Sequence, residues 1–250
     1  YLTCARRFEL RYIEQVRWPA LETEPAVQHE ARMRQGAAFH HLLHQHALGI
    51  PASKIEQQIQ NDPVLMDWWQ NYRQHRPADL PEQRYPEQVL SAPVGTYRVL
   101  AKYDLLALEP DGRAVIVDWK TSKRKPARDA LAHHIQTLVY PYVLTLAGAD
   151  LNDEQPVEPE QIEMIYWFSE HPNQPEHFHY DRDQLAQTTA YLQDLITEIA
   201  QQQVFPQTAN EQHCRFCVYR SLCDRGVNAG DIDEWDDDEQ TDLMNLDIAF

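Results

Sequence analysis

Glycine is scarce in this sequence, with 7 residues among 250, and the pattern G-x-x-x-x-G-K-[ST] does not occur. A P-loop motor is therefore not encoded, and any ATP-driven step would have to come from another subunit. No run of about 18 uncharged apolar residues is present, so we expect no membrane-spanning helix. A secretory pattern, a basic end followed by an apolar stretch, is also missing. We therefore expect a cytoplasmic protein. Because the chain begins at Tyr1 rather than Met, we expect a few residues to precede it.

Basic residues are outnumbered, since 22 Lys and Arg stand against 39 Asp and Glu and give a net charge of −17. That charge disfavours a nucleic-acid partner, but its distribution weakens the conclusion. Residues 231–250 hold nine of the acids and no Lys or Arg. Basic side chains gather elsewhere, at Arg6, Arg7, Arg11 and Arg17 and at Lys120, Lys123, Arg124, Lys125 and Arg128. Local patches, not the total charge, must therefore decide which partners fit.

The spacing of apolar residues changes from helical to strand-like and back along the chain. The pattern predicts helices up to about Ile13 and over 29–48, 63–75, 127–148 and 181–203. It predicts strands over 87–95, 97–109, 113–121, 160–170 and 175–181, with a turn at Pro110–Gly112. This order favours an α/β (α+β) fold with one central mixed β-sheet flanked by helices.

Asp118 and Lys120 form the most informative pair, in the segment "VIVDWKTSK". On a strand their side chains share one face, whereas Val117 and Trp119 point to the other, which we expect to be the core. Two interpretations stand: an exposed ion pair, or a metal ligand beside a cation that steadies a reacting phosphate. A hairpin through "EPDG" would bring Asp104 close to Asp118, and two converging carboxylates are costly unless a cation lies between them. Mg²⁺ or Mn²⁺ would meet that need.

Four motifs in order resemble the RecB-like branch of the PD-(D/E)XK nuclease superfamily. They are "GAAFH" with Gly36 and His40, "KYD" with Asp104, "DWK" with Asp118 and Lys120, and "QTLVY" with Gln136 and Tyr140. Asp118 stands where many relatives carry Glu, and Ala37 where they often carry Thr. The resemblance covers nearly the whole chain and implies a restriction-endonuclease-like core, which we expect to be a single domain over 1–230.

The resemblance implies metal-dependent hydrolysis of DNA, on single strands, ends or flaps, by an exonuclease rather than an endonuclease. His40, Asp104 and Asp118 would hold one or two ions, Mg²⁺ or Mn²⁺, which lower the pKa of a bound water. Lys120 would orient or help deprotonate that water, and Gln136 and Tyr140 would support the site. The alternative is a catalytically silent DNA-binding or scaffold subunit of a repair or defence complex.

The four cysteines divide unequally, with Cys4 near the start and Cys214, Cys217 and Cys223 near the end. Their types and spacing allow a Cys4 zinc site or an iron–sulfur cluster. The layout resembles the iron–sulfur branch of the same nucleases, found in AddB-type subunits and CRISPR-associated exonucleases. That resemblance implies a structural [4Fe–4S] cluster, with zinc as the alternative, that joins the two ends of the chain.

Two further features concern partners. The segment 231–250 is too acidic to fold alone, so we expect it to be disordered; it could be a solubilising tail, cover the basic groove in place of DNA, or dock on a partner. Trp68, Trp69, Tyr72 and Tyr97 could stack on bases, although core packing is the simpler role for each. Because relatives often work beside a helicase, a helicase or another repair or defence subunit is a possible partner.

Overall fold

The structure is a computed structural model that describes residues 1–17, 24–109, 112–226 and 248–249. The predicted turn residues Pro110 and Asp111 and most of the predicted acidic tail, 231–247 and 250, lie outside the described residues. The helices are α1 (Ala5–Phe8), a π-helical turn (Glu9–Ile13), α2 (Glu24–Ala47), α3 (Ala52–Ile59), α4 (Pro63–His75), α5 (Arg128–Ala132), α6 (Ile135–Ala147) and α7 (Arg182–Gln201). The strands are β1 (Gln83–Val94), β2 (Tyr97–Leu108), β3 (Ala114–Lys120), β4 (Ile162–Phe168), β5 (Glu176–His179) and β6 (Ile248–Ala249).

The strands form one mixed sheet, as the sequence predicted, and β1 to β5 lie in it in the order β1-β2-β3-β4-β5. β3 and β4 run parallel, and the other neighbouring pairs are antiparallel. A parallel pair needs a long crossover connection, which α5 and α6 supply between β3 and β4. The short β6 pairs with β2 at Arg98 and Val99, near the turn from β1.

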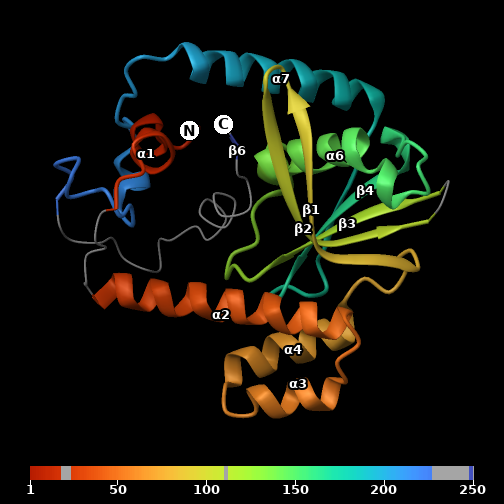
Figure 1. The fold of residues 1–250 in the computed structure, drawn as a ribbon. Helices are drawn as coiled ribbons and strands as arrows, with labels where there is room; N and C mark the ends of the chain where they lie inside the picture. The colour runs from red at the N-terminus through yellow and green to blue at the C-terminus, as the bar shows by residue number, and fades with distance from the viewer. Residues whose placement is uncertain (18–23, 110–111, 227–247, 250) are drawn as a thin grey trace.

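Helices cover both faces of the sheet (Figure 1). On one face, β-strand residues such as Ile116 and Tyr166 pack in a core with α6 and α7. On the other, Val117 and Trp167 pack in a second core with α2, α3 and α4. The sequence predicted a core on one face of β3 only, and that prediction was wrong: every residue of β3 is buried, because helices lie on both sides.

Most predicted elements are present, with two differences. The predicted helix over 127–148 divides into α5 and α6, because His134 adopts an extended backbone conformation with ψ of 140°. The Thr137 hydroxyl donates a hydrogen bond to the Leu131 carbonyl across this break at 2.5 Å, which replaces a lost helical bond. Helix α3 was not predicted. Among the described helices, none is both long and apolar enough to cross a membrane.

β1 and β2 change face together halfway along their length. Tyr103 lies in the core beside α6, whereas Leu105, two residues on, lies in the core beside α2. Side chains at i and i+2 of a regular strand share a face, so the strand turns at Asp104. Glu87 lies opposite Asp104, because the residues on either side of them are paired across β1 and β2. The backbone of Glu87 has a positive φ of 54°. This bend determines where the polar side chains of the next subsection point.

Two segments far apart in the sequence pack against each other, and we call residues 1–16 together with 204–225 the terminal clasp (Figure 1). The Arg6 amide donates to the Pro206 carbonyl at 3.0 Å, and the Tyr219 hydroxyl donates to the Val16 carbonyl at 3.0 Å. Phe8 packs on Phe205 with ring centroids 6.1 Å apart. The clasp therefore joins residues such as Val16 and Tyr219, which are 203 positions apart in the sequence.

Candidate active site

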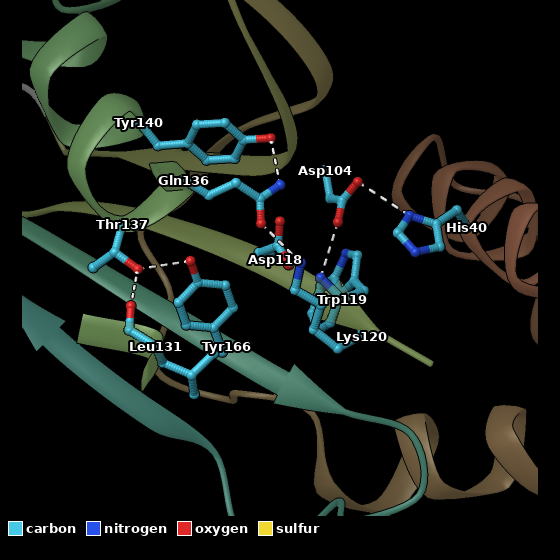
Figure 2. A network of polar contacts seen from close by, with 10 residues as sticks. All are labelled: His40, Asp104, Asp118, Trp119, Lys120, Leu131, Gln136, Thr137, Tyr140 and Tyr166. Atoms are coloured by element: carbon cyan, nitrogen blue, oxygen red, sulfur yellow. Dashed lines mark hydrogen bonds and ion pairs between the residues drawn. The ribbon is translucent and has the colours of Figure 1, made fainter. Parts of the chain in front are cut away.

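β2 and β3 separate at Asp104, and we call this opening the β2–β3 split. Their pairing ends at Leu105 and Val117, so the next residues, Asp104 and Asp118, face each other across the opening. The Asp104 Oδ2 accepts a hydrogen bond from the Trp119 amide at 2.9 Å, in place of a backbone partner. The predicted hairpin is confirmed, and it brings the two carboxylates to one place (Figure 2).

Asp118, Lys120, Gln136 and Tyr140 form a buried chain of polar contacts (Figure 2). The Lys120 Nζ lies 3.1 Å from the Asp118 Oδ2 and donates to the Gln136 Oε1 at 2.8 Å. The Gln136 Nε2 donates to the Tyr140 hydroxyl at 3.1 Å. Asp118 and Lys120 are each only 2% exposed, so the interpretation of an exposed ion pair was wrong. Helix α6 covers them, which the sequence pattern of β3 alone did not reveal.

The surroundings of Asp118 offset only part of the free-energy cost of burying its carboxylate. Burial raises its pKa, and the nearby charge of Asp104 raises it further, against the opposing effect of Lys120. Among the described residues, the Asp118 Oδ2 is buried, and its one contact of this kind is the ion pair with Lys120. Buried carboxylate oxygens are normally hydrogen-bonded or bound to a metal. This atom therefore fits a ligand position for a hard divalent cation.

His40 approaches the split from the opposite face, on α2. Its Nδ1 lies 3.1 Å from the Asp104 Oδ1. Burial alone would lower the pKa of His40, but the charges of Asp104, Asp118 and Glu87 outweigh that effect and raise it. Burial conversely favours a higher pKa for Asp104, yet His40, the Trp119 amide and Lys120 together lower it. These directions favour an ion pair between the Asp104 carboxylate and the protonated imidazole of His40.

Gly36 explains why α2 can come so close. A Cβ added at this position would lie 3.0 Å from the Thr121 Oγ1, directly after β3. A side chain at this position would require the Thr121 hydroxyl or the helix to shift, and His40 lies one turn further along the same helix. The G-x-x-x-H spacing therefore combines a close contact with a ligand position.

Glu87 is a site residue that the sequence reasoning missed. One ligand atom each from His40, Glu87 and Asp104 lie within 4.8 Å of one another, the spacing of a metal site. Asp118, which was expected in this set, is not part of it. The available signal was the change of pattern in β1, where Tyr85 and then Leu90 pack on the same core despite their odd spacing. A bend near Glu87 follows from that change.

The four cysteines lie together in the terminal clasp. Cys4, Cys214, Cys217 and Cys223 line one hollow with Arg7, Arg220 and Arg225. All four are free thiols. Burial raises the pKa of the last three, as does the proximity of other thiols. Converging thiols beside arginines fit an anionic metal–thiolate centre, since a metal replaces the protons and the arginines balance the remaining charge.

The aromatic residues considered for base stacking do not line the site as an open platform. Trp68, Trp69 and Tyr72 are 2%, 0% and 6% exposed and pack on Phe39 and Trp167 in the second core. Tyr97 is half-buried against the first core. Core packing is therefore the role of these rings in the structure.

Comparisons with known proteins place these features in a family. A crystal structure of SSO0001 is similar with a TM-score of 0.42 and 15% identity over 88% of this chain and 81% of that one. A candidate exonuclease from Eubacterium rectale is similar with a TM-score of 0.45 and 11% identity over 79% of this chain and 73% of that one. No curated protein matches significantly. The family model of the PD-(D/E)XK nuclease superfamily matches residues 1–224, and the chain belongs to that superfamily.

Proposed function

We propose that this protein is a divalent-metal-dependent deoxyribonuclease of the RecB-like branch, which acts as an exonuclease on single-stranded DNA, ends or flaps. The observation that carries the proposal is the β2–β3 split, where Asp104 and Asp118 converge beside a buried lysine. Superfamily membership supports nuclease chemistry independently of this geometry. Mg²⁺ and Mn²⁺ are the ions that such carboxylates favour.

His40, Asp104 and Asp118 would hold the ion from three elements, α2, β2 and β3. A divalent ion at this position supplies a water of lowered pKa and neutralises charge that develops on the scissile phosphate. His40 contributes a neutral nitrogen when it releases its proton, and Asp104 stays ionised because its surroundings lower its pKa. Asp104 is thus in the ionised form that metal binding requires, whereas an ion would displace the proton from His40.

Lys120 would position the attacking water and stabilise negative charge on the phosphate. Its ammonium is held between Asp118 and Gln136, and Gln136 is in turn fixed by Tyr140. A buried, oriented cation stabilises a developing charge more than a solvated one does, because no solvent must reorganise. Gln136 and Tyr140 therefore act as positioning residues in this proposal.

Substrate binding would begin at the loop that follows β3. Lys123 and Arg124 are exposed directly after the buried end of the strand. Lys125 and Arg128, from the same basic group, instead form ion pairs with Glu176. Exposed cations beside the split would contact the DNA backbone, since phosphate contacts need charge but no sequence information.

The terminal clasp would carry a [4Fe–4S] cluster on Cys4, Cys214, Cys217 and Cys223. All four thiols line one hollow, and their layout along the chain resembles that of the iron–sulfur nucleases. A tetrahedral zinc on the same four thiols is the alternative. We also propose a cytoplasmic location, in which a helicase or another repair or defence subunit binds the protein.

Incubation with end-labelled single- and double-stranded DNA tests the function. The wild-type protein should release nucleotides in Mg²⁺ or Mn²⁺ and none in EDTA, whereas Asp118→Ala and Lys120→Ala should bind DNA without cleaving it. A circular single strand distinguishes the modes, because an exonuclease leaves it intact. Retained DNA binding with no cleavage by the wild type would instead identify a silent binding subunit.

A further inference from the structure

We propose that Tyr166 is a further positioning residue for the cleavage step, because its ring lies against Lys120 and fixes the direction of the lysine ammonium. The inference rests on the proposed function, in which Lys120 stabilises negative charge on the phosphate. Tyr166 lies on β4, outside the motifs found in the sequence. Gln136 holds the same lysine from α6.

The register of the sheet places Tyr166 beside the buried ion pair. β3 and β4 run parallel, and Tyr166 lies opposite Asp118. Phe168 lies opposite Lys120. The Lys120 Nζ lies 3.1 Å from the Asp118 Oδ2 and 5.5 Å from the centre of the Tyr166 ring. The lysine side chain therefore runs back along its strand, so that its ammonium lies over Tyr166.

The contact between the ring and the ammonium is shielded from water. Tyr166 is fully buried and Lys120 nearly so. An aromatic ring attracts an ammonium within about 6 Å of its centre, and the attraction is stronger where water is excluded. Groups on three elements, β3, α6 and β4, thus hold the Lys120 ammonium. A cation held in this way keeps its direction and need not reorganise as charge develops on the phosphate.

The Tyr166 hydroxyl in turn fixes the ring. It lies 2.8 Å from the Thr137 Oγ1, which donates to the Leu131 carbonyl at 2.5 Å. Because a threonine hydroxyl has only one proton, Tyr166 is the donor in the first of these bonds. Figure 2 shows the resulting chain from the ring to the break between α5 and α6. Gln136 and Thr137 are neighbours, so the start of α6 holds the lysine both directly and through Tyr166.

Tyr166 also belongs to the first core, where its ring meets the Phe178 ring edge-on at 6.0 Å. A test must therefore separate positioning from packing, and Phe168 supplies the matched control. It lies two residues further along β4 and is equally buried in the same core. Its ring lies beneath Lys125 at 5.8 Å, and Lys125 forms an ion pair with Glu176.

Replacement of Tyr166 by Phe, and by phenylalanines with one, two and three ring fluorines, tests the proposal in the full-length protein. Fluorine draws electron density from the ring face and weakens its attraction for a cation, while the size of the ring hardly changes. We expect the single-turnover rate of cleavage to fall with each fluorine, by roughly tenfold over the series, at unchanged DNA affinity in EDTA. The same series at Phe168 should leave the rate unchanged.

Ordinary substitutions give a second test. Tyr166→Leu should slow cleavage roughly tenfold, whereas Phe168→Leu, which loses an equally buried ring, should lower only the melting temperature. Thr137→Val should slow cleavage by about threefold, because the ring is no longer fixed, and Thr137→Ser should restore the rate. A constant rate along the fluorine series would overturn the inference, as would equal losses of rate in Tyr166→Leu and Phe168→Leu.

NMR spectroscopy of protein with labelled lysine separates this inference from the proposed function. The Tyr166 ring should shift the ε-methylene protons of Lys120 upfield in the wild type but not in Tyr166→Leu, and the signal is identified by its absence in Lys120→Arg. If that shift is present and the wild type cleaves no DNA, the nuclease function is wrong while the ring contact stands. If the wild type cleaves DNA at a rate that changes at residue 166 do not affect, the positioning role alone is wrong.

Discussion

Lys120 lies 3.1 Å from Asp118, and their side chains are only 2% and 3% exposed. Such a pair is costly to bury, so its value to the fold is small compared with the damage done by removing one partner. The pair therefore indicates that the geometry of this site serves a chemical role rather than the stability of the fold.

Lys120→Met should abolish cleavage and also destabilise the metal-free protein by about 3–5 kcal/mol, because Asp118 is left buried without a cation. Added Mn²⁺ should recover part of this stability, since an ion replaces the lost charge. Urea denaturation with and without Mn²⁺ measures both effects. The exposed Lys54→Met serves as control and should change the free energy of unfolding by less than about 0.5 kcal/mol. Equal losses in both variants would contradict the argument.

Tyr140→Phe should lower the rate of cleavage about tenfold, because Gln136 loses its anchor and holds Lys120 less firmly. Tyr142→Phe is the matched control on the same helix, since its hydroxyl donates to the Pro93 carbonyl at 3.0 Å, away from the site. Each variant loses one hydrogen bond and about 1 kcal/mol of stability. Only Tyr140→Phe should slow catalysis, and a similar rate for both variants would remove the positioning role.

Gly36→Ala should reduce both metal affinity and cleavage by several-fold, although Ala favours a helix by about 1 kcal/mol over Gly. The added Cβ would lie 3.0 Å from the Thr121 hydroxyl and displace His40 with α2. The double variant Gly36→Ala/Thr121→Ala removes that hydroxyl and should regain activity while keeping the helix propensity. Activity that stays low in the double variant would show that the Thr121 contact is not the cause.

Replacement of any one of the four cysteines by Ser should release iron and lower the melting temperature, because the clasp then lacks a ligand. Anaerobically purified wild type should contain about four iron atoms per chain and absorb near 400 nm. The residues that we propose to cleave DNA lie outside the clasp, so purified variants that stay folded should keep some activity. One zinc per chain, without iron or sulfide, would identify the alternative centre.

Acid should destabilise the protein partly through His134. Burial and then the charge of Lys120 lower its pKa to about 3. The unfolded chain therefore takes up a proton near the ordinary pKa of 6.5, while the folded chain binds none until about pH 3. Because the unfolded state binds more protons in this window, the free energy of unfolding falls as the pH falls from 6.5 toward 3.

His134→Gln removes this proton uptake and should flatten the decline, as measured by urea denaturation at several pH values. The exposed neighbour His133→Gln is the control and should keep the wild-type slope. A wild-type slope in His134→Gln would mean that other groups account for the acid sensitivity.

Most of the fold could be predicted from the sequence, because the strands and long helices have strong, regular patterns of apolar residues. β2 and β3 were predicted to within one residue, since their alternation and the intervening turn signal are local properties of the chain. Their hairpin then determined that Asp104 and Asp118 would meet. Helix α3, with only eight residues, gave too short a pattern to recognise.

What the sequence could not show arises from packing between elements. The burial of Asp118 and Lys120 depends on α6 lying over β3, and nothing in the strand itself reveals that cover. Glu87 joins the site only because two paired strands bend together, which is a tertiary property. The roles of His40, Gln136 and Tyr140 stay predictions. The structure brings His40 into contact with Asp104, and it connects Tyr140 through Gln136 to Lys120.

The terminal clasp has a consequence for how the protein is made. The hydrogen-bonded residues Val16 and Tyr219 are 203 positions apart. At about 5–20 residues per second, a ribosome needs about 10–40 s to synthesise the intervening chain. During that interval Phe8 cannot pack on Phe205, and Cys4 lacks the other three cysteines of the clasp. A ribosome that stalls after α7 but before Cys214 therefore releases a chain whose two ends cannot close.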